Sequence, residues 1–447
     1  MIPALRNGSA RKDCMQEVGI GLLGLGTVGG GVADLLTRDA DRLAARAGVR
    51  PALKRIAERN PEAGAEVQID RRIITPDPRE VISDPSVDVV VELIGGTDAA
   101  RDLVLAALRA GKPVVTANKA LLAHHGREIM AESEARGVPV YFEASVGGGI
   151  PILRAIREGL VADQIESVMG IVNGTCNYIL TRMESRHCTY EEALADARAQ
   201  GYAEADPSLD VDGWDSAHKT IVLAAMAFGW WMPLDRVTRY GIARFSPRDL
   251  ELAAAIGRRV KLLSILKKTE RGLELSVEPC LVPAVGPLGT VNGVFNAIWV
   301  RGQPVGDTLY RGRGAGRDAT SSAVVGDIVE AVMRRAFGGG MPLGIIPSAT
   351  PAPPVVPAPE HVSAYGLRVS FPDFRAGERT DAALKILQRH GLHTAEVHTL
   401  RWADGEGSSL VLLCRPSPSK TAAAAVTDLR SLPGADPVVN RLRMEDM

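Results

Sequence analysis

Features that would assign this chain to a specialised class are scarce in its sequence. Five cysteines in 447 residues, with no C-x-x-C pair, fit neither a disulfide framework nor a zinc site, so we expect a reducing, cytoplasmic environment. No apolar run reaches the ~18 residues of a membrane span, and the longest candidate, 221–231, indicates a buried helix. The 52 basic and 53 acidic residues nearly cancel, which excludes a whole-chain attraction to nucleic acid or anionic membranes.

The first third of the chain alternates short apolar runs with helical patterns. The runs span residues 18–23, 72–75, 87–94, 113–116 and 139–142, and a weaker candidate spans 49–58. Strands without polar alternation, each followed by a helix, indicate a parallel sheet covered on both faces. We therefore predict a disordered extension over 1–16 and a Rossmann-like, doubly wound α/β domain over 17–145.

The pattern changes over residues 146–315, where helices come first and strands later. Helical patterns cover 151–159, 177–184, 190–200, 214–229 and 247–268, and strand patterns cover 273–282 and 293–300. This order predicts an α+β second domain. A further helical pattern within 316–340 is expected to pack back on the first domain.

The last part of the chain begins with a segment too rich in proline for a helix or a central strand. This segment, 341–360, predicts a semi-rigid linker. Residues 361–447 then show strand, helix, strand, strand, helix and strand patterns. That order is typical of a small ferredoxin-like domain.

A glycine motif follows the first predicted strand. Gly24-Leu25-Gly26-Thr27-Val28-Gly29 matches G-x-G-x-x-G between a strand and a helix. The first glycine permits the tight turn, the second allows a pyrophosphate to approach the backbone, and the third allows helix–strand packing. The motif predicts dinucleotide binding, with a purely structural glycine turn as the alternative.

The residues at the position that selects between NAD and NADP are compatible with both cofactors. An acidic residue near the end of the second strand favours NAD, whereas an arginine there accommodates the 2′-phosphate of NADP. Glu58 and Arg59 stand side by side at this position. Both cofactors stay open from the residues alone, as does a pair of solvated charges.

Carboxylates are concentrated in the stretch 201–219. They lie in a loop with Pro and Gly, and the helix that follows carries Asp215 and Lys219 on one face at i and i+4. Because that helix continues into an apolar segment, the Lys219 ammonium should lie near a low-dielectric wall, where it could protonate an alkoxide. An exposed salt bridge beside a solvated acidic loop is the alternative.

A second lysine, the histidines and one cysteine are the other candidates for chemistry. Lys119 follows the predicted strand 113–116, at the sheet edge where open α/β folds bind ligands; a lysine that merely begins a helix is the alternative. No histidine has the spacing of a metal ligand. Cys176 carries no sign of activation, which favours a packing role.

Seven segments resemble homoserine dehydrogenase, in the order in which that family carries them. They are GLLGLGTVGGGV (21–32), VVVELIGG (89–96), GKPVVTANKALLA (111–123), FEASVGGGIPI (142–152), GIVNGTCNYIL (170–180), GYAEADPSLDVDGWDSAHK (201–219) and YRGRGAG (310–316). The linker and the last domain resemble the long form of the family, which ends in an ACT-type regulatory domain.

The resemblance implies a reaction and a set of site residues. The reaction is the reversible reduction of L-aspartate 4-semialdehyde to L-homoserine by NAD(P)H, in threonine, methionine and isoleucine biosynthesis. Lys219 would be the proton donor, with Lys119 assisting between cofactor and substrate. Substrate-binding positions would be Glu204, Asp215, Asp210, Thr175 and Tyr202. Cofactor-binding positions would be Gly24, Leu25, Gly26, Thr27, Val28, Gly29, Arg59, Thr116, Lys119, Gly201 and Gly316.

The resemblance also implies features that leave no side-chain signal. The family carries a structural monovalent cation, usually sodium, on backbone oxygens that map onto Glu143, Val146, Gly148 and Ile150. We further expect a homodimer or homotetramer built through the second domain. Threonine is the candidate effector of the last domain.

The chain departs from the family pattern at three places. The second strand of the family usually ends in a valine–arginine pair, and Glu58 replaces the valine, which puts strict NADP use in doubt while NADP remains slightly favoured over NAD. After Gly316 the family continues toward Pro-Thr-Ala, whereas this chain has Arg317-Asp318-Ala319-Thr320. The ACT-type ligand turn is missing in its usual form at 371–377.

Two other functions remain as alternatives at this stage. One is a different NAD(P)-dependent semialdehyde reductase, and the other is a non-catalytic dinucleotide sensor. An aspartate-semialdehyde dehydrogenase is disfavoured, because it needs a reactive cysteine beside a base, and Cys176 has no obvious base near it in the sequence.

Overall fold

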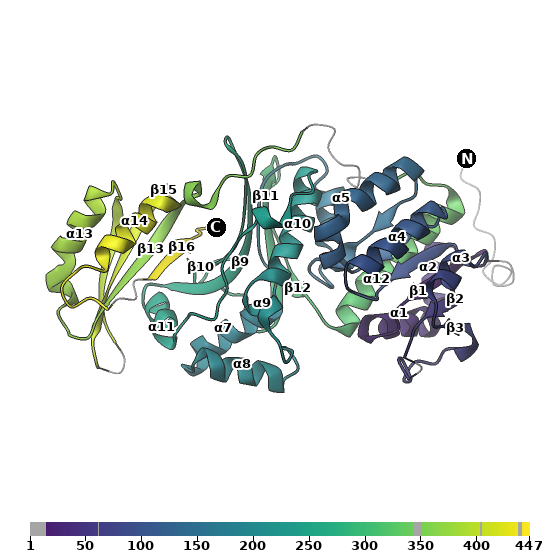
Figure 1. Cartoon of the computed structure of the whole chain (residues 1–447), viewed down its shortest axis with the longest axis horizontal. Coiled ribbons are helices and arrows are strands. Elements are labelled where there is room, and N and C mark those ends of the chain that lie inside the picture. The colour runs from purple at the N-terminus through teal and green to yellow at the C-terminus, as the bar shows by residue number, and fades with distance from the viewer. Residues whose placement is uncertain (1–14, 61, 343–350, 403–404, 437–439) are drawn as a thin grey trace, which may run out of the picture. The chain divides into compact units, whose positions relative to one another are not determined.

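The computed structural model describes residues 15–60, 62–342, 351–402, 405–436 and 440–447 (Figure 1). The chain forms two compact units, the first made of 1–162, 225–231 and 313–349 and the second of 163–224, 232–312 and 350–447. The expected extension, up to residue 14, and part of the expected linker, 343–350, lie outside the described residues. The three-domain division with its linker stays a prediction.

The first unit is built on a six-stranded parallel sheet. Its strands are β1 (Glu17–Leu23), β2 (Arg50–Ala57), β3 (Ile74–Thr75), β4 (Val89–Glu92), β5 (Val114–Thr116) and β6 (Val140–Tyr141). They lie in the order β3-β2-β1-β4-β5-β6. This is the doubly wound Rossmann order, in which ligands bind beyond the carboxyl ends of the strands where the order reverses. The predicted fold class and the weak second strand are both confirmed.

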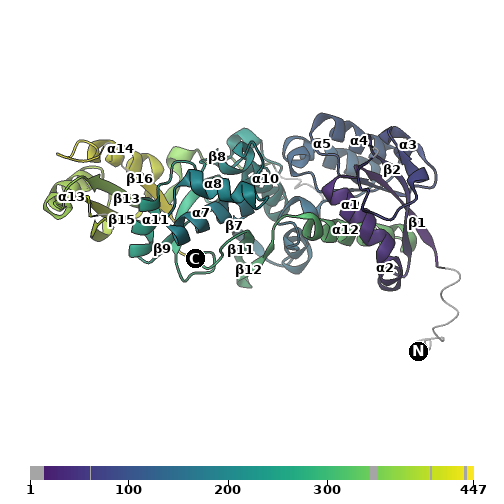
Figure 2. The ribbon, with the colours of Figure 1, turned by 90° about the horizontal axis from the view of Figure 1, so that it is seen from below.

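Helices cover both faces of this sheet. Figure 2 shows α3 (Pro78–Ser83), α4 (Asp98–Arg109) and α5 (Lys119–Arg136) on one face, and α1 (Thr27–Arg38), α2 (Ala40–Ala47) and α12 (Arg317–Phe337) on the other. The central strands β4 and β5 are fully buried because neither of their faces meets water, whereas β2, nearer the sheet edge, carries basic side chains and is mostly half-buried.

The late helix α12 packs against α1, although its Ser321 lies 293 positions after Val28 of α1. Ser321 Oγ donates a hydrogen bond to the carbonyl oxygen of Val28 at 3.0 Å. A Cβ at Gly31 would lie 2.3 Å from Ser321 Oγ, so the small residue permits the close approach of the two helices. Val324 and Ile328 of α12 complete the apolar core of the first unit.

The second unit contains a ten-stranded mixed sheet. Its strands are β7 (Gln164–Ile171), β8 (Thr238–Arg239), β9 (Arg258–Thr269), β10 (Gly272–Pro283), β11 (Phe295–Gln303), β12 (Gly306–Arg313), β13 (Val362–Phe371), β14 (Thr394–Arg401), β15 (Ser408–Pro418) and β16 (Asn440–Met444). The order is β12-β11-β7-β9-β10-β16-β13-β15-β14, with β8 beside β10. The parallel pairing of β10 with β16 makes the sheet continuous from residue 164 into the last segment.

The last segment follows the predicted strand and helix order. Helix α13 (Thr380–Arg389) lies between β13 and β14, and α14 (Ser419–Leu429) lies between β15 and β16. Both helices contribute apolar side chains to a core of their own against these strands.

One predicted helix is wrong over more than half of its length. Within the expected helix 247–268, α11 (Pro247–Ala255) ends before Gly257, whose φ is 70°, and β9 follows. Both faces of β9 are largely buried, so the polar alternation that marks a half-buried strand is missing there. The strands β7 and β12 were not predicted.

Four α-helices of the second unit lie between β7 and β8. They are α7 (Gly174–Arg186), α8 (Tyr190–Ala199), α9 (Ser208–Val211) and α10 (Trp214–Phe228). None of the helices in the described ranges is long and apolar enough to cross a membrane.

Candidate active site

The glycine loop of the first unit is shaped for close approach of a ligand. Gly24 has φ of 95°, and a Cβ there would lie 2.8 Å from the carbonyl oxygen of Leu93. A Cβ at Gly29 would lie 2.1 Å from the carbonyl oxygen of Gly24, whereas nothing lies within 4 Å of a Cβ at Gly26. Gly26 is the N-cap of α1 and offers no side-chain cap. The first amides of the helix therefore stay available to an anion, as a pyrophosphate requires.

The end of β2 is joined to this loop. Gly24 N donates to the carbonyl oxygen of Ala57 at 2.9 Å, and Leu25 N donates to Glu58 Oε2 at 2.8 Å. Burial opposes ionisation of Glu58, but the amides of Asn60 and Leu25 outweigh it and lower the pKa of its carboxyl group. Arg59, the predicted contact for the 2′-phosphate, is exposed.

The carboxyl ends of β4 and β5 form a second polar part of the first unit. Thr116 Oγ1 donates to Glu92 Oε2 at 2.6 Å, and the amides of Ile94 and Gly95 donate to Glu92 Oε1. Burial raises the pKa of Glu92 despite these donors. Thr116 was among the predicted residues and Glu92 was not, although an acidic residue at the end of the apolar run Val89–Glu92 is a visible signal.

Lys119 lies beside this polar part. It is the first residue of α5 and is half-buried. The side chain of Asn118 caps the helix by accepting a hydrogen bond from Leu121 N at 3.0 Å, and its amide nitrogen donates to the carbonyl oxygen of Gly96. The turn before Lys119 is thereby fixed to the loop after β4. Gly316, the N-cap of α12, also belongs to the first unit, whereas Gly201 belongs to the second.

In the second unit, Lys219 is buried and is fixed by two acceptors. Its Nζ lies 2.7 Å from Asp215 Oδ2 and 2.7 Å from the carbonyl oxygen of Val172. The side chains of Asp215 and Lys219 are 10% and 9% exposed, so the alternative of an exposed salt bridge is wrong. The helix continues into the fully buried residues Ile221 and Val222, which supply the low-dielectric wall that the sequence predicted.

Asn173 links this pair to another predicted residue. Its Nδ2 donates to Asp210 Oδ1 at 2.7 Å and to Asp215 Oδ2 at 2.9 Å. Its Oδ1 accepts from Cys176 N at 2.8 Å and caps α7. One amide therefore fixes the start of α7 to both carboxylates. These contacts of Asn173 were not predicted from the sequence, and Asx capping ahead of a helix was the signal that could have found them.

The remaining substrate positions are arranged more loosely. Thr175 Oγ1 donates to the carbonyl oxygen of Tyr202 at 2.7 Å, so the start of α7 is tied to the loop after α8. The Tyr202 ring packs edge-on against Tyr178, with 4.9 Å between ring centroids. Glu204 follows in the same loop and is exposed. The structure thus brings together Lys219, Asp215 and Asp210, and it leaves the Glu204 side chain at the surface of the unit.

Cys176 is not a nucleophile in this arrangement. It is fully buried, and its Sγ donates to the carbonyl oxygen of Asp210 at 3.2 Å. Burial raises the pKa of its thiol well above the usual value, and the carboxylates of Asp210 and Asp215 add to this. Because the thiolate is the reactive form, the packing role predicted from the sequence fits.

The residues proposed for the cation lie in a buried loop of the first unit. Between Glu143 and Ile150 only Gly149 is exposed, and Gly147 and Gly148 have positive φ. No backbone amide of the described residues donates to the carbonyl oxygen of Val146 or Gly148. Buried carbonyls need partners, so the loop suits a cation held by backbone oxygens. No group of three or more His, Cys, Asp or Glu side chains within the described ranges could hold a metal.

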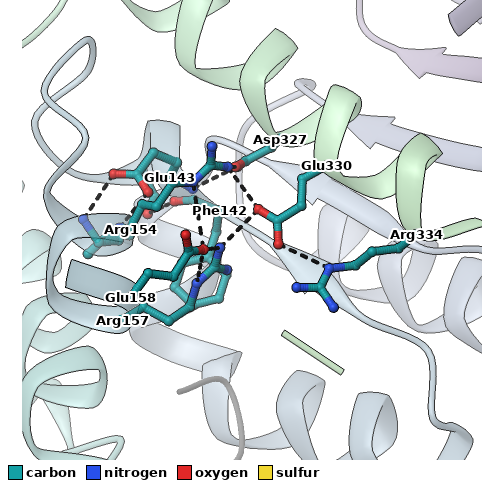
Figure 3. A network of polar contacts seen from close by, with 10 residues as sticks. Phe142, Glu143, Arg154, Arg157, Glu158, Asp327, Glu330 and Arg334 are labelled. Carbon is teal, nitrogen blue, oxygen red and sulfur yellow. Dashed lines mark hydrogen bonds and ion pairs between the residues drawn. The ribbon is translucent and has the colours of Figure 1, made fainter. Parts of the chain in front are cut away.

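Side chains from α12 fix the start of this loop (Figure 3). The Glu143 carboxylate accepts hydrogen bonds from Leu153 N and Arg154 N, at 2.9 and 2.7 Å. Arg154 pairs with Asp327 and with Glu330, at 3.1 and 2.9 Å. This network did not follow from any local sequence pattern, because α12 supplies its acids from far along the chain.

Comparisons with known proteins agree with one another. The homoserine dehydrogenase NAD binding domain matches residues 24–143, and the homoserine dehydrogenase model matches residues 151–329. A homoserine dehydrogenase of Pseudomonas aeruginosa is 41% identical over 437 residues, which are 97% of this chain and 100% of that protein.

Solved structures show the same likeness. A homoserine dehydrogenase from Thiobacillus denitrificans is 40% identical and superimposes with a TM-score of 0.89, over 97% of this chain and 99% of that chain. A hyperthermophilic archaeal homoserine dehydrogenase in complex with NADPH is 27% identical, with a TM-score of 0.61 over 71% of this chain and 98% of that chain.

Proposed function

The chain belongs to the homoserine dehydrogenase family, and we propose that Lys219 is the proton donor of its reaction. As a member, it is an NAD(P)-dependent oxidoreductase that interconverts L-homoserine and L-aspartate 4-semialdehyde. The other semialdehyde reductase and the non-catalytic sensor are not favoured. The single observation that carries the role of Lys219 is its buried ammonium, fixed between Asp215 and the carbonyl oxygen of Val172.

The donor count of the ammonium explains how it acts. A lysine ammonium has three N–H donors, and two of those of Lys219 donate to Asp215 Oδ2 and the carbonyl oxygen of Val172. The third can donate to the aldehyde oxygen and pass its proton to the alkoxide as the carbonyl is reduced. In the reverse direction, the neutral amine takes up the hydroxyl proton of homoserine. Asp215 keeps the ammonium oriented and stabilises its charge.

Carboxylates of the same unit suit the amino group of the substrate. Asp210 and Asp215 lie on either side of the Asn173 amide, and Glu204 is exposed in the loop between α8 and α9. We assign these three carboxylates to the substrate ammonium and hydroxyl, with Thr175 and Tyr202 at the border of the site. Lys119 assists from the cofactor side.

The glycine loop suits the dinucleotide. The amides of Gly26, Thr27 and Val28, with Gly24, Leu25 and Gly29 shaping the turn, would hold the pyrophosphate, and Thr116, Lys119 and Gly316 of the same unit would line the site. Open space at Gly26 and the uncapped start of α1 support this assignment. When bound, the nicotinamide supplies or accepts the hydride.

Other family features are proposed on narrower grounds. The buried carbonyls of Glu143, Val146, Gly148 and Ile150 suit a structural sodium ion.

The ferredoxin-like segment after residue 361 suits an ACT-type regulatory module that binds threonine. The protein would then act in threonine, methionine and isoleucine biosynthesis. The described cysteines are all free, which fits a cytoplasmic protein, and we propose a homodimer or homotetramer built through the second unit.

Turnover of purified protein tests the proposed function. Homoserine with each oxidised dinucleotide should produce reduced nicotinamide, and Lys219→Ala should abolish most of the rate of this production. Dinucleotide binding without any turnover by the wild type would instead support the sensor.

A separate binding experiment tests the effector. Threonine should bind the wild type but not Asp373→Ala, because Asp373 lies in the turn after β13, paired with Arg379 at 2.8 Å.

A further inference from the structure

The turn after β2 fixes a carboxylate beside the glycine loop. Glu58 is the first residue beyond β2, and its backbone N donates to the carbonyl oxygen of Thr75 at 2.9 Å. One carboxylate oxygen accepts from Leu25 N at 2.8 Å and the other accepts from Asn60 N at 2.9 Å. Backbone amides of two separate segments thus determine where this negative charge lies.

This position is the one at which dinucleotide-binding folds read the adenosine ribose. An acidic side chain at the end of the second strand accepts hydrogen bonds from the ribose hydroxyls of NAD, whereas NADP carries a phosphate on the 2′ oxygen. Each carboxylate oxygen can accept more than one hydrogen bond. The two amides that fix Glu58 therefore leave acceptor capacity for both ribose hydroxyls.

Arg59 cannot compensate fully for the neighbouring charge. Its side chain is exposed, whereas Glu58 is half-buried. An arginine in water gains little from an ion pair, because the solvent and salt screen it. A phosphate of nearly two negative charges would meet a fixed carboxylate at close range and a solvent-exposed guanidinium.

We propose that Glu58 makes the dinucleotide site selective for NAD over NADP, by binding the ribose diol and repelling the 2′-phosphate, while Arg59 preserves weak use of NADP. This inference rests on the proposed dinucleotide site in the glycine loop. It reverses the slight preference for NADP expected from the family resemblance, and it gives the replacement of the usual valine a physical consequence.

Equilibrium binding of NADH and NADPH, followed by nucleotide fluorescence, tests the proposal without turnover. The wild type should bind NADH at least about tenfold more tightly than NADPH, in line with a charged hydrogen bond gained or lost. Glu58→Gln retains an oxygen for Leu25 N but removes the charge, so the NADPH to NADH affinity ratio should rise by about tenfold or more. Arg59→Ala should weaken NADPH and leave NADH unchanged.

Matched variants separate selectivity from loss of structure. Glu62→Gln removes one exposed negative charge from the same segment and should leave the ratio unchanged. If Glu58→Val fails to fold, the nearly isosteric Glu58→Gln decides, with thermal unfolding as the check. A wild type that prefers NADPH, or an unchanged ratio in Glu58→Gln, overturns the proposal. Selective binding without homoserine turnover would contradict the proposed function alone.

Discussion

The carboxylate of Asp327 accepts a hydrogen bond from the backbone N–H of Glu143, with 2.8 Å between Oδ2 and the nitrogen. The two residues are 184 positions apart in the chain, and the contact ties α12 to the start of the buried loop proposed for the cation. Burial and the neighbouring Glu143 carboxyl raise the pKa of Asp327 to about 7. Both acids therefore belong to one coupled network.

Asp327→Asn should remove a pH dependence of stability. The folded protein binds the Asp327 proton more tightly than the unfolded chain, whose carboxyl has the ordinary value of 3.8. The stabilisation of the folded state that results from this tighter binding is fully present below the unfolded pKa of 3.8 and is lost as pH rises through about 7. Its size is at most about 4 kcal/mol. Urea unfolding from about pH 4 to 8 should show a smaller decline in the variant. The exposed Asp318→Asn on the same helix should decline like the wild type.

Lys219→Ala should lower turnover of homoserine by about 10² or more, because the proton donor is lost. The glycine loop belongs to the other unit, so the dissociation constant of NADH should change by less than about threefold. Lys268→Ala, at an exposed position of β9, is the control. Turnover within a few-fold of wild type in Lys219→Ala would remove Lys219 from the mechanism.

Asn173→Ala should affect both stability and substrate affinity. The loss of the α7 cap costs about 1 kcal/mol, and the freed carboxylates of Asp210 and Asp215 should raise the KM for homoserine. Thr189→Ala removes the cap of α8 and should cost similar stability without changing KM. Equal effects of the two variants on KM would show that Asn173 acts only as a cap.

Arg443→Leu should destabilise the chain by about 3–5 kcal/mol, because it strips a buried set of carboxylates of their cation. Arg443 pairs with Glu274, Glu278 and Glu445 while its own side chain is 1% exposed. Denaturant unfolding measures the loss, and the exposed Arg430→Ala should cost little. A small loss in Arg443→Leu would mean that β16 is held on β10 by its backbone alone.

Sodium should raise the thermal midpoint relative to choline at equal ionic strength, since a cation bound only by the folded loop stabilises it. Gly148→Ala should abolish this response: its φ is 52°, and a Cβ would lie 2.5 Å from the carbonyl oxygen of Gly314. Gly111→Ala has similar backbone strain with nothing within 4 Å, and it should retain the response. An identical midpoint in both salts argues against the site.

Much of the first unit, and one residue pair of the second, followed from the sequence. The strand runs, the glycine motif and the i, i+4 spacing of Asp215 and Lys219 are properties of neighbouring residues, so a local pattern records them. The helix predicted over 247–268 is wrong from residue 258 onward because β9 is buried on both faces, and a short apolar stretch of that kind fits a helix and a strand equally well.

The sequence by itself determined the Rossmann-like fold, the ferredoxin-like order of the last segment and the residues that could carry the chemistry. Only the tertiary structure decided that the Asp215–Lys219 pair is buried, that Asn173 lies between two carboxylates, and that Glu58 contacts the glycine loop. The reason is that residue type and spacing set the local backbone preference and the reactions that a side chain can take part in. Burial and hydrogen-bond partners depend instead on which distant segments pack together.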